Sequence, residues 1–113
     1  MKIINAYIQE FMCEKTTDAL REAHIHGITV VQCMGFGQQS EEESHRYLDK
    51  TVRAGFAPKM KLEIVCADAE AEAVSNIIQT AAHTGKNGDG KILISDIHKA
   101  IDIRTGASGD GAL

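Results

Sequence analysis

A chain of 113 residues and 12.2 kDa is long enough for one domain with a modest hydrophobic core. Its net charge of -4 and aromatic content of 4% argue against the basic face or aromatic platform that nucleic-acid binding normally uses. No apolar run approaches the ~18–20 residues that span a bilayer. The chain shows no signal peptide, and its three cysteines contain no C-x-x-C pair. We therefore expect a cytoplasmic protein with reduced thiols.

The first part of the chain predicts a strand, a helix and a second strand. Residues 2–8 are short, apolar and rich in β-formers, which is typical of a strand. Within residues 14–24, Thr17, Leu20, Ala23 and His24 trace one helical face, and Gly27 is placed to end that helix in the left-handed conformation. Residues 28–34 are β-branched and apolar, which indicates a strand.

The later part of the chain repeats this order. Residues 59–66 predict a third strand, and Asp68 follows as the expected N-cap of a second helix. The apolar positions of this helix recur at helical spacing at Val74, Ile77, Ile78 and Ala81.

The chain ends in a short strand and polar segments. Residues 91–95 predict the fourth strand, and Asp96 is a candidate cap for a short helical turn over residues 97–100. The glycine-rich tail at residues 107–113 is expected to be mobile.

The order of these elements indicates an α+β fold over residues 1–113. Two β-α-β units, interrupted by a polar segment at about residues 36–57, match the ferredoxin-like βαββαβ plan. Both helices then cover one face of a four-stranded antiparallel sheet. The other face still carries apolar residues, which a closed homo-oligomer would cover. The long interrupting segment is expected to be functional or a solvated flap.

The stretch T-G-K-N-G-D-G-K-I at residues 84–92 is the main candidate for a ligand site. Its glycines allow positive φ angles and close approach to backbone N–H groups, and Lys91 adds a positive charge, so the stretch suits a phosphate. A Walker A loop is excluded, because Ile92 replaces the Mg²⁺-binding Ser or Thr and the order is helix, loop, strand. Judged by glycine content alone, a connection without any ligand is about as well supported as a phosphate-binding loop.

The motif at residues 84–92 resembles the B-loop of the PII signal-transduction (nitrogen regulatory protein P-II) family. Three further sequence motifs are similar to motifs of that family, at the entry into its T-loop, at the exit from it and in its C-loop. They are Gly35-Phe36-Gly37 with Gln39, Pro58-Lys59 with Lys61-x-Glu63-Ile64, and Ile103-Arg104-Thr105-Gly106. They stand in family order over nearly the whole chain. The resemblance implies a T-loop at about residues 36–57, a B-loop at residues 83–91 and a C-loop at about residues 101–106.

The resemblance implies a regulator without catalytic residues. PII proteins are trimers that bind ATP or ADP between subunits, and many bind 2-oxoglutarate with Mg-ATP at the base of the T-loop. The T-loop then docks on a target enzyme, transporter or transcriptional regulator. We therefore expect a homotrimer that binds ADP, ATP or AMP, with Mg²⁺ and a small-anion co-effector. It would have no nucleic-acid partner and would meet membranes only through a target.

Site residues are carried over from the family by position. The nucleotide-binding set is Thr29, Gly35, Gly37, Gln38, Glu63, His83, Thr84, Gly85, Gly88, Asp89, Gly90, Lys91 and Arg104. Within it, Glu63 would pair with Lys91, and Arg104 would reach a phosphate from the adjacent subunit. The effector-binding residues would be Gln39, linked to metal or 2-oxoglutarate, and Lys59, a partner for the effector's carboxylate.

The chain departs from the family at several positions. His83, Gln38 and Asp102 stand where the family has arginines, so three bidentate phosphate donors are lost and Asp102 adds repulsion. This favours ADP or AMP over ATP. The family's uridylylated tyrosine falls at Thr51 or Val52, so uridylylation is not expected. These changes indicate a divergent PII-like protein with its own target.

Two other classes of function compete with this hypothesis. A small phosphate-handling ferredoxin-like enzyme would need a nucleophile–base pair, and none is evident in the sequence. A metal-binding ferredoxin-like trimer would use His45 with the acidic run at residues 41–43. The ordered motifs favour the regulator.

Overall fold

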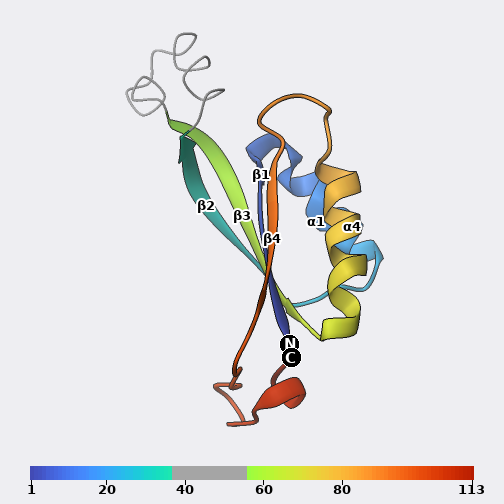
Figure 1. Ribbon diagram of the computed structural model, residues 1–113, viewed down its shortest axis with the longest axis vertical. Helices are drawn as coiled ribbons and strands as arrows, with labels where there is room; N and C mark the ends of the chain where they lie inside the picture. The colour runs from blue at the N-terminus through green and yellow to red at the C-terminus, as the bar shows by residue number, and fades with distance from the viewer. Residues whose placement is uncertain (37–55) are drawn as a thin grey trace.

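Residues 1–36 and 56–113 are described by a computed structural model, in which two helices pack on one face of a four-stranded sheet (Figure 1). All strand pairs are antiparallel, in the order β2-β3-β1-β4. This confirms the predicted ferredoxin-like α+β fold. The strands are β1 (Lys2–Gln9), β2 (Ile28–Phe36), β3 (Phe56–Cys66) and β4 (Gly90–Asp96). The helices are α1 (Cys13–Glu22) and α4 (Ala71–Ala82), with 3-10 turns η1 (Glu10–Met12), η2 (Asp68–Glu70) and η3 (Gly109–Ala112).

The core lies between the sheet and the helices. Alternate residues of β1 and β3 point toward the helices, so Ile4, Leu62 and Ile64 are almost completely buried. From the helices, Leu20 and Ile78 fill the same cluster. Burying each such side chain contributes about 1.5–3 kcal/mol. Neither helix has the length or apolar character that crossing a membrane requires among the residues described.

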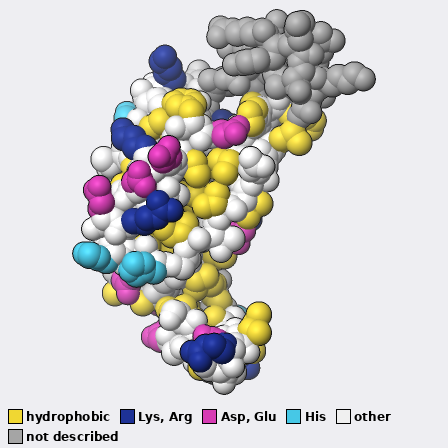
Figure 2. Space-filling model, turned by 180° about the vertical axis from the view of Figure 1, so that it is seen from behind, with side chains coloured by type: hydrophobic (Ala, Val, Ile, Leu, Met, Phe, Trp, Pro, Cys, Tyr) yellow, Lys and Arg dark blue, Asp and Glu magenta, His cyan; other side chains and the backbone are white. Residues whose placement is uncertain are grey.

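The opposite face of the sheet is uncovered in the single chain. Val31 on β2 and Leu93 on β4 lie on this face, and their residues are 39% and 51% exposed. The space-filling view from behind shows further hydrophobic side chains at the surface (Figure 2). The exposure of Val31 and Leu93 agrees with the expectation that the open face requires a cover.

The end of α1 differs from the prediction. Gly27 is left-handed as predicted, with φ of +73°, but the left-handed residue that ends the helix is His24, with φ of +61°. The His24 N–H donates to the Arg21 carbonyl and the Ile25 N–H to the Leu20 carbonyl, both at 2.9 Å. These two bonds form a Schellman motif, which ends the helix three residues before Gly27.

The two predicted aspartate caps are wrong. Asp68 lies in η2, and its carboxylate binds the amino group of Met1 at 2.8 Å. Asp96 is the last residue of β4 and pairs with Lys2, and residues 97–100 contain no helical turn. In both cases a cation nearby in the fold, but distant in sequence, takes the carboxylate that a local cap would have used.

The sheet extends further toward the long loop than predicted. Phe36 still belongs to β2 and Phe56 begins β3, and their rings lie 5.7 Å apart. Pro58 therefore lies inside β3, opposite Met34. A proline is tolerated there because pairing with β1 stops at Lys59, so β3 is locally an edge strand.

Candidate anion-binding site

The glycine-rich loop connects the end of α4 at Ala82 to the start of β4. Gly85, Gly88 and Gly90 all have positive φ angles, of +86°, +96° and +108°. A Cβ built on Gly90 would overlap the carbonyl oxygen of Tyr7 on β1. Gly90 is therefore required by backbone packing, apart from any ligand.

The carboxylate of Asp89 is the centre of the loop. Its Oδ2 accepts the backbone N–H groups of Thr84 at 2.8 Å and Gly85 at 2.9 Å. Its Oδ1 accepts the Thr84 hydroxyl, and the amide Nε2 of Gln9 at 3.1 Å. Four donors therefore converge on one side chain and fold the loop around it.

These donors hold Asp89 ionised. Burial raises the pKa of Asp89, but the hydrogen bonds from Thr84, Gly85 and Gln9 outweigh it and lower the pKa to about 2. The Nδ1 of His83 lies 3.7 Å from Oδ2, so a protonated His83 would add an ion pair. The Asp89 carboxylate therefore shapes the loop, and the contact of Asp89 with phosphate stays a prediction.

Few backbone donors of the loop remain for a ligand. Asp89 takes the N–H groups of Thr84 and Gly85, and the Thr84 hydroxyl accepts the N–H of Lys86 at 3.2 Å. Within the described structure, the N–H groups of Asn87, Gly88 and Asp89 have no hydrogen-bond acceptor. The tip of the loop is therefore where an anion can bind.

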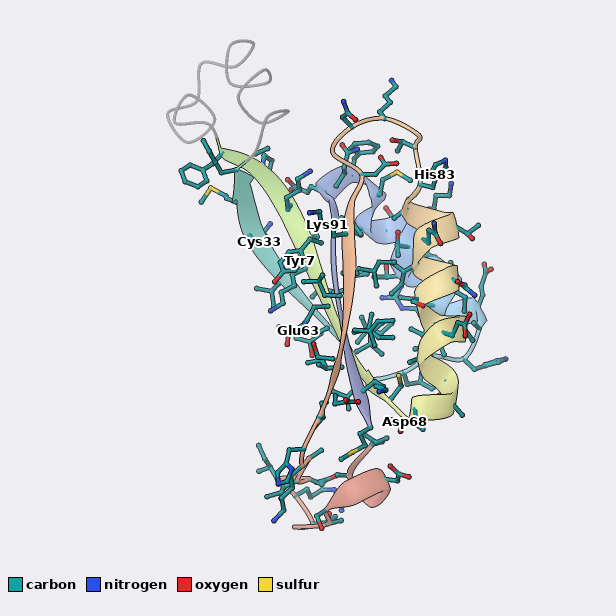
Figure 3. The ribbon with its side chains drawn as sticks, viewed as in Figure 1. Tyr7, Cys33, Glu63, Asp68, His83 and Lys91 are labelled. Atoms are coloured by element: carbon teal, nitrogen blue, oxygen red, sulfur yellow. The ribbon has the colours of Figure 1, made fainter. Side chains whose placement is uncertain are left out.

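Lysines from the sheet lie beside the loop. Lys59 donates from Nζ to the Gly88 carbonyl at 2.7 Å. Lys61 on β3 and Lys91 on β4 lie opposite Tyr7 on either side of β1. Tyr7 and Lys91 lie on the side of the sheet away from the helices (Figure 3). The positive charge required for an anion is therefore held on rigid strands.

The predicted Glu63–Lys91 pair is not formed in the single chain. The carboxylate of Glu63 lies 3.6 Å from the Nζ of Lys61 instead. The register explains the difference, because Glu63 is opposite Asn5 whereas Lys91 is opposite Tyr7, with β1 between the two strands.

Comparison with known proteins assigns the family. The family model for nitrogen regulatory protein P-II matches residues 1–107. The chain belongs to this family. It is similar over the full length of both chains to nitrogen regulatory protein P-II of Rhizobium meliloti (strain 1021), at 44% identity over 114 residues. It is similar in the same way to nitrogen regulatory protein GlnK of Escherichia coli (strain K12), at 36% identity over 113 residues.

A solved P-II structure agrees with the fold. The crystal structure of Arabidopsis thaliana PII bound to citrate superposes with a TM-score of 0.81 at 30% identity, covering 99% of this chain and 91% of that one. P-II proteins are signalling regulators in nitrogen regulation, as the ordered motifs predicted. The glycine-rich loop at residues 83–91 is called the B-loop from here on, the name that the resemblance to the family predicts for it.

The remaining predicted site residues do not all reach the B-loop. Thr29 lies on β2 opposite Glu63, and Gly35 lies against the Lys59 side chain, where an added Cβ would come within 3.2 Å of Cγ. Arg104 belongs to the turn that follows β4, and this C-terminal segment lies at the opposite end of the sheet from the B-loop (Figure 1). The positions predicted at Gly37, Gln38 and Gln39 lie outside the described residues.

The C-terminal turn shows a role for Asp102 that the sequence did not reveal. Its Oδ1 accepts the N–H groups of Arg104 at 2.8 Å and Thr105 at 3.2 Å. The Asp102 N–H donates to the Ala107 carbonyl and the Gly106 N–H to the Asp102 carbonyl, both at 2.8 Å. Asp102 therefore builds the turn that presents Arg104, besides being the lost arginine position.

A cavity of about 440 Å³ lies between α4 and β4 under the B-loop. It is lined by Tyr7, Ile8, Ser75, Ile78, Gln79, Ala82, His83, Asp89, Gly90, Lys91, Ile92 and Ile94. Among residues 1–36 and 56–113, no three His, Cys, Asp or Glu side chains gather as metal ligands. His45 and the acidic residues 41–43 of the metal hypothesis lie outside the described residues.

Gln9 is the site residue that sequence reasoning missed. Its only local signal is a polar side chain at the end of a strand. Its partner Asp89 is 80 residues away in the chain. The contact exists only because β1 and β4 pair in this register.

Proposed function

We propose that this P-II protein binds the phosphates of an adenine nucleotide at the B-loop and regulates a target protein through its T-loop. The observation that carries this proposal is the preformed B-loop. Asp89 folds it, the N–H groups of Asn87 and Gly88 are left for an anion, and Lys59 and Lys91 supply positive charge. The residues expected nearest the phosphates are Gly85, Gly88, Lys91 and His83.

The preferred nucleotide is ADP or AMP. His83 and Gln38 replace guanidinium groups that would bind a triphosphate bidentately. The carboxylate of Asp89 already accepts four hydrogen bonds, so Mg²⁺ would be held by phosphate oxygens and by Gln39, which lies outside the described residues.

The complete site requires more than one chain. Arg104 lies at the far end of the sheet from its own B-loop, and the open face exposes Val31 and Leu93. A homotrimer would cover this face and bring Arg104 of one subunit to the B-loop of the next. We place this assembly in the cytoplasm.

A small anion such as 2-oxoglutarate would act as co-effector through Gln39 and Lys59. The Nζ of Lys59 is bound to a neutral carbonyl, that of Gly88, which a carboxylate would outcompete. The PII protein of Arabidopsis thaliana, which this chain resembles, binds the small polycarboxylate citrate in its crystal structure.

Calorimetric titration with ATP, ADP and AMP, each with and without Mg²⁺ and 2-oxoglutarate, tests the proposal. We expect micromolar binding and at least about tenfold weaker binding for Lys91→Ala, because a phosphate loses a cation held on a strand. Lys15→Ala is the matched control, since Lys15 is exposed on α1. Unchanged affinity for Lys91→Ala would remove the B-loop assignment, and silence of the wild type across all nucleotides would overturn the function.

A further inference from the structure

Two kinds of contact shape the B-loop, and they do different work. The bonds from Thr84 and Gly85 to Asp89 run within the loop, so they fold it but do not fix its position relative to the sheet. The bonds from Gln9 to Asp89 and from Lys59 to Gly88 run from the sheet to the loop. Only this second kind places the folded loop over the strands.

Gln9 and Lys59 are direct neighbours in the antiparallel ladder of β1 and β3. From this one rung they hold two consecutive loop residues, Gly88 through its carbonyl and Asp89 through its carboxylate. Gly90 then enters β4 beside Ile8. The arm of the loop that returns to the sheet is therefore held at three successive residues.

The N–H groups of Asn87, Gly88 and Asp89 have no acceptor within the described residues, so holding the Gly88–Asp89 arm also holds donors for the anion. A donor that is already in place loses little conformational freedom when the ligand binds. The ligand therefore binds more tightly than it would to a donor that is free to move. An untied loop would keep its internal fold while its donors moved relative to Lys91.

We propose that Gln9 is a positioning residue for the phosphate group, acting through Asp89 and together with Lys59 to hold the B-loop in its anion-binding position. This inference rests on the proposed nucleotide-binding function. Lys59 is itself expected to meet the co-effector, so a Lys59 variant would not separate the two roles. Gln9 does separate them, because its amide is directed to Asp89.

The test compares Gln9→Met, which keeps the length but removes the donor, with Gln9→Lys, which restores a donor to Asp89. Gln32→Met is the control, since Gln32 is an exposed glutamine on β2. Each protein is titrated with ADP, and the pKa of the Asp89 carboxyl is followed by NMR. We expect Gln9→Met to raise the pKa of Asp89 above about 2 and to weaken ADP binding about fivefold. Gln9→Lys should reverse both changes, and Gln32→Met should show neither.

The outcomes separate the inference from the function. If the wild type binds ADP and Gln9→Met binds it equally well, the positioning role is overturned, whatever happens to the pKa of Asp89. Weaker binding with an unchanged Asp89 pKa also overturns it, because Gln9 would then act on the ligand directly. A wild type that binds no nucleotide overturns the proposed function and this inference with it.

Discussion

The two turns that flank β4 are each folded around an aspartate carboxylate, but they differ in how they are held against the rest of the protein. The B-loop before the strand is folded around Asp89, which accepts four hydrogen bonds, and the C-terminal turn after it around Asp102, which accepts two. The B-loop is also tied to the sheet by Gln9 and Lys59. Ile103 at the C-terminal turn is fully exposed. An aspartate with neighbouring N–H groups suffices to make a turn, but distant side chains decide where the turn is held.

The largest expected difference in stability between the two turns comes from replacing one glycine in each. Gly90→Ala should destabilise the fold by about 3 kcal/mol or more, because its Cβ would meet the Tyr7 backbone and its φ is +108°. Gly106→Ala, with φ of +73° and open space around the Cβ, should cost only about 1 kcal/mol of backbone strain. Urea unfolding at one fixed protein concentration measures both. Equal losses would show that the B-loop is no more tightly held than the C-terminal turn.

The two aspartates give the next largest difference. Asp89→Asn should cost about 2 kcal/mol at neutral pH, because one amide cannot replace a carboxylate that accepts four donors. Asp102→Asn should cost about 0.5 kcal/mol or less, since asparagine makes the same turn. The urea midpoints of both variants against the wild type test this ranking.

The lowered pKa of Asp89 predicts that the stability of the fold depends on pH. The folded-state pKa of Asp89, about 2, lies below the usual value for an aspartate, about 4. Its ionised form therefore stabilises the fold above about pH 4, and this contribution is lost as the pH falls toward about 2. The wild type should approach Asp89→Asn in stability over that range. A constant gap between them from neutral pH to about pH 2 would contradict the assignment.

The threonines give the smallest expected effect. Thr84→Val removes a hydroxyl that donates to Asp89 and accepts from Lys86, and should cost about 1–2 kcal/mol. Thr105→Val removes only an acceptor for the Ala107 N–H, on the exposed turn, and should cost about 0.5 kcal/mol. Thermal unfolding of both variants resolves the difference, and a reversed order would mean that the C-terminal turn is the more tightly held of the two.

Much of the fold followed from the sequence because its signals are local. Short apolar runs rich in β-formers predicted the strands, the spacing of Val74, Ile78 and Ala81 predicted the second helix, and the order of motifs predicted the family. The helix ends were harder. His24 ends α1 although glycine adopts the left-handed conformation far more readily than histidine, and the Schellman bonds hold His24 there.

The sequence alone therefore predicted the four strands, the two helices and the glycine-rich turn with Lys91 that follows the second helix. Only the tertiary structure decided which groups that turn contacts. The Asp89 carboxylate shapes the loop, Gln9 ties it to the sheet, and Glu63 pairs with Lys61 instead of Lys91. The reason is physical: periodicity is set by neighbouring residues, whereas these partners meet only through strand register, which no local pattern encodes.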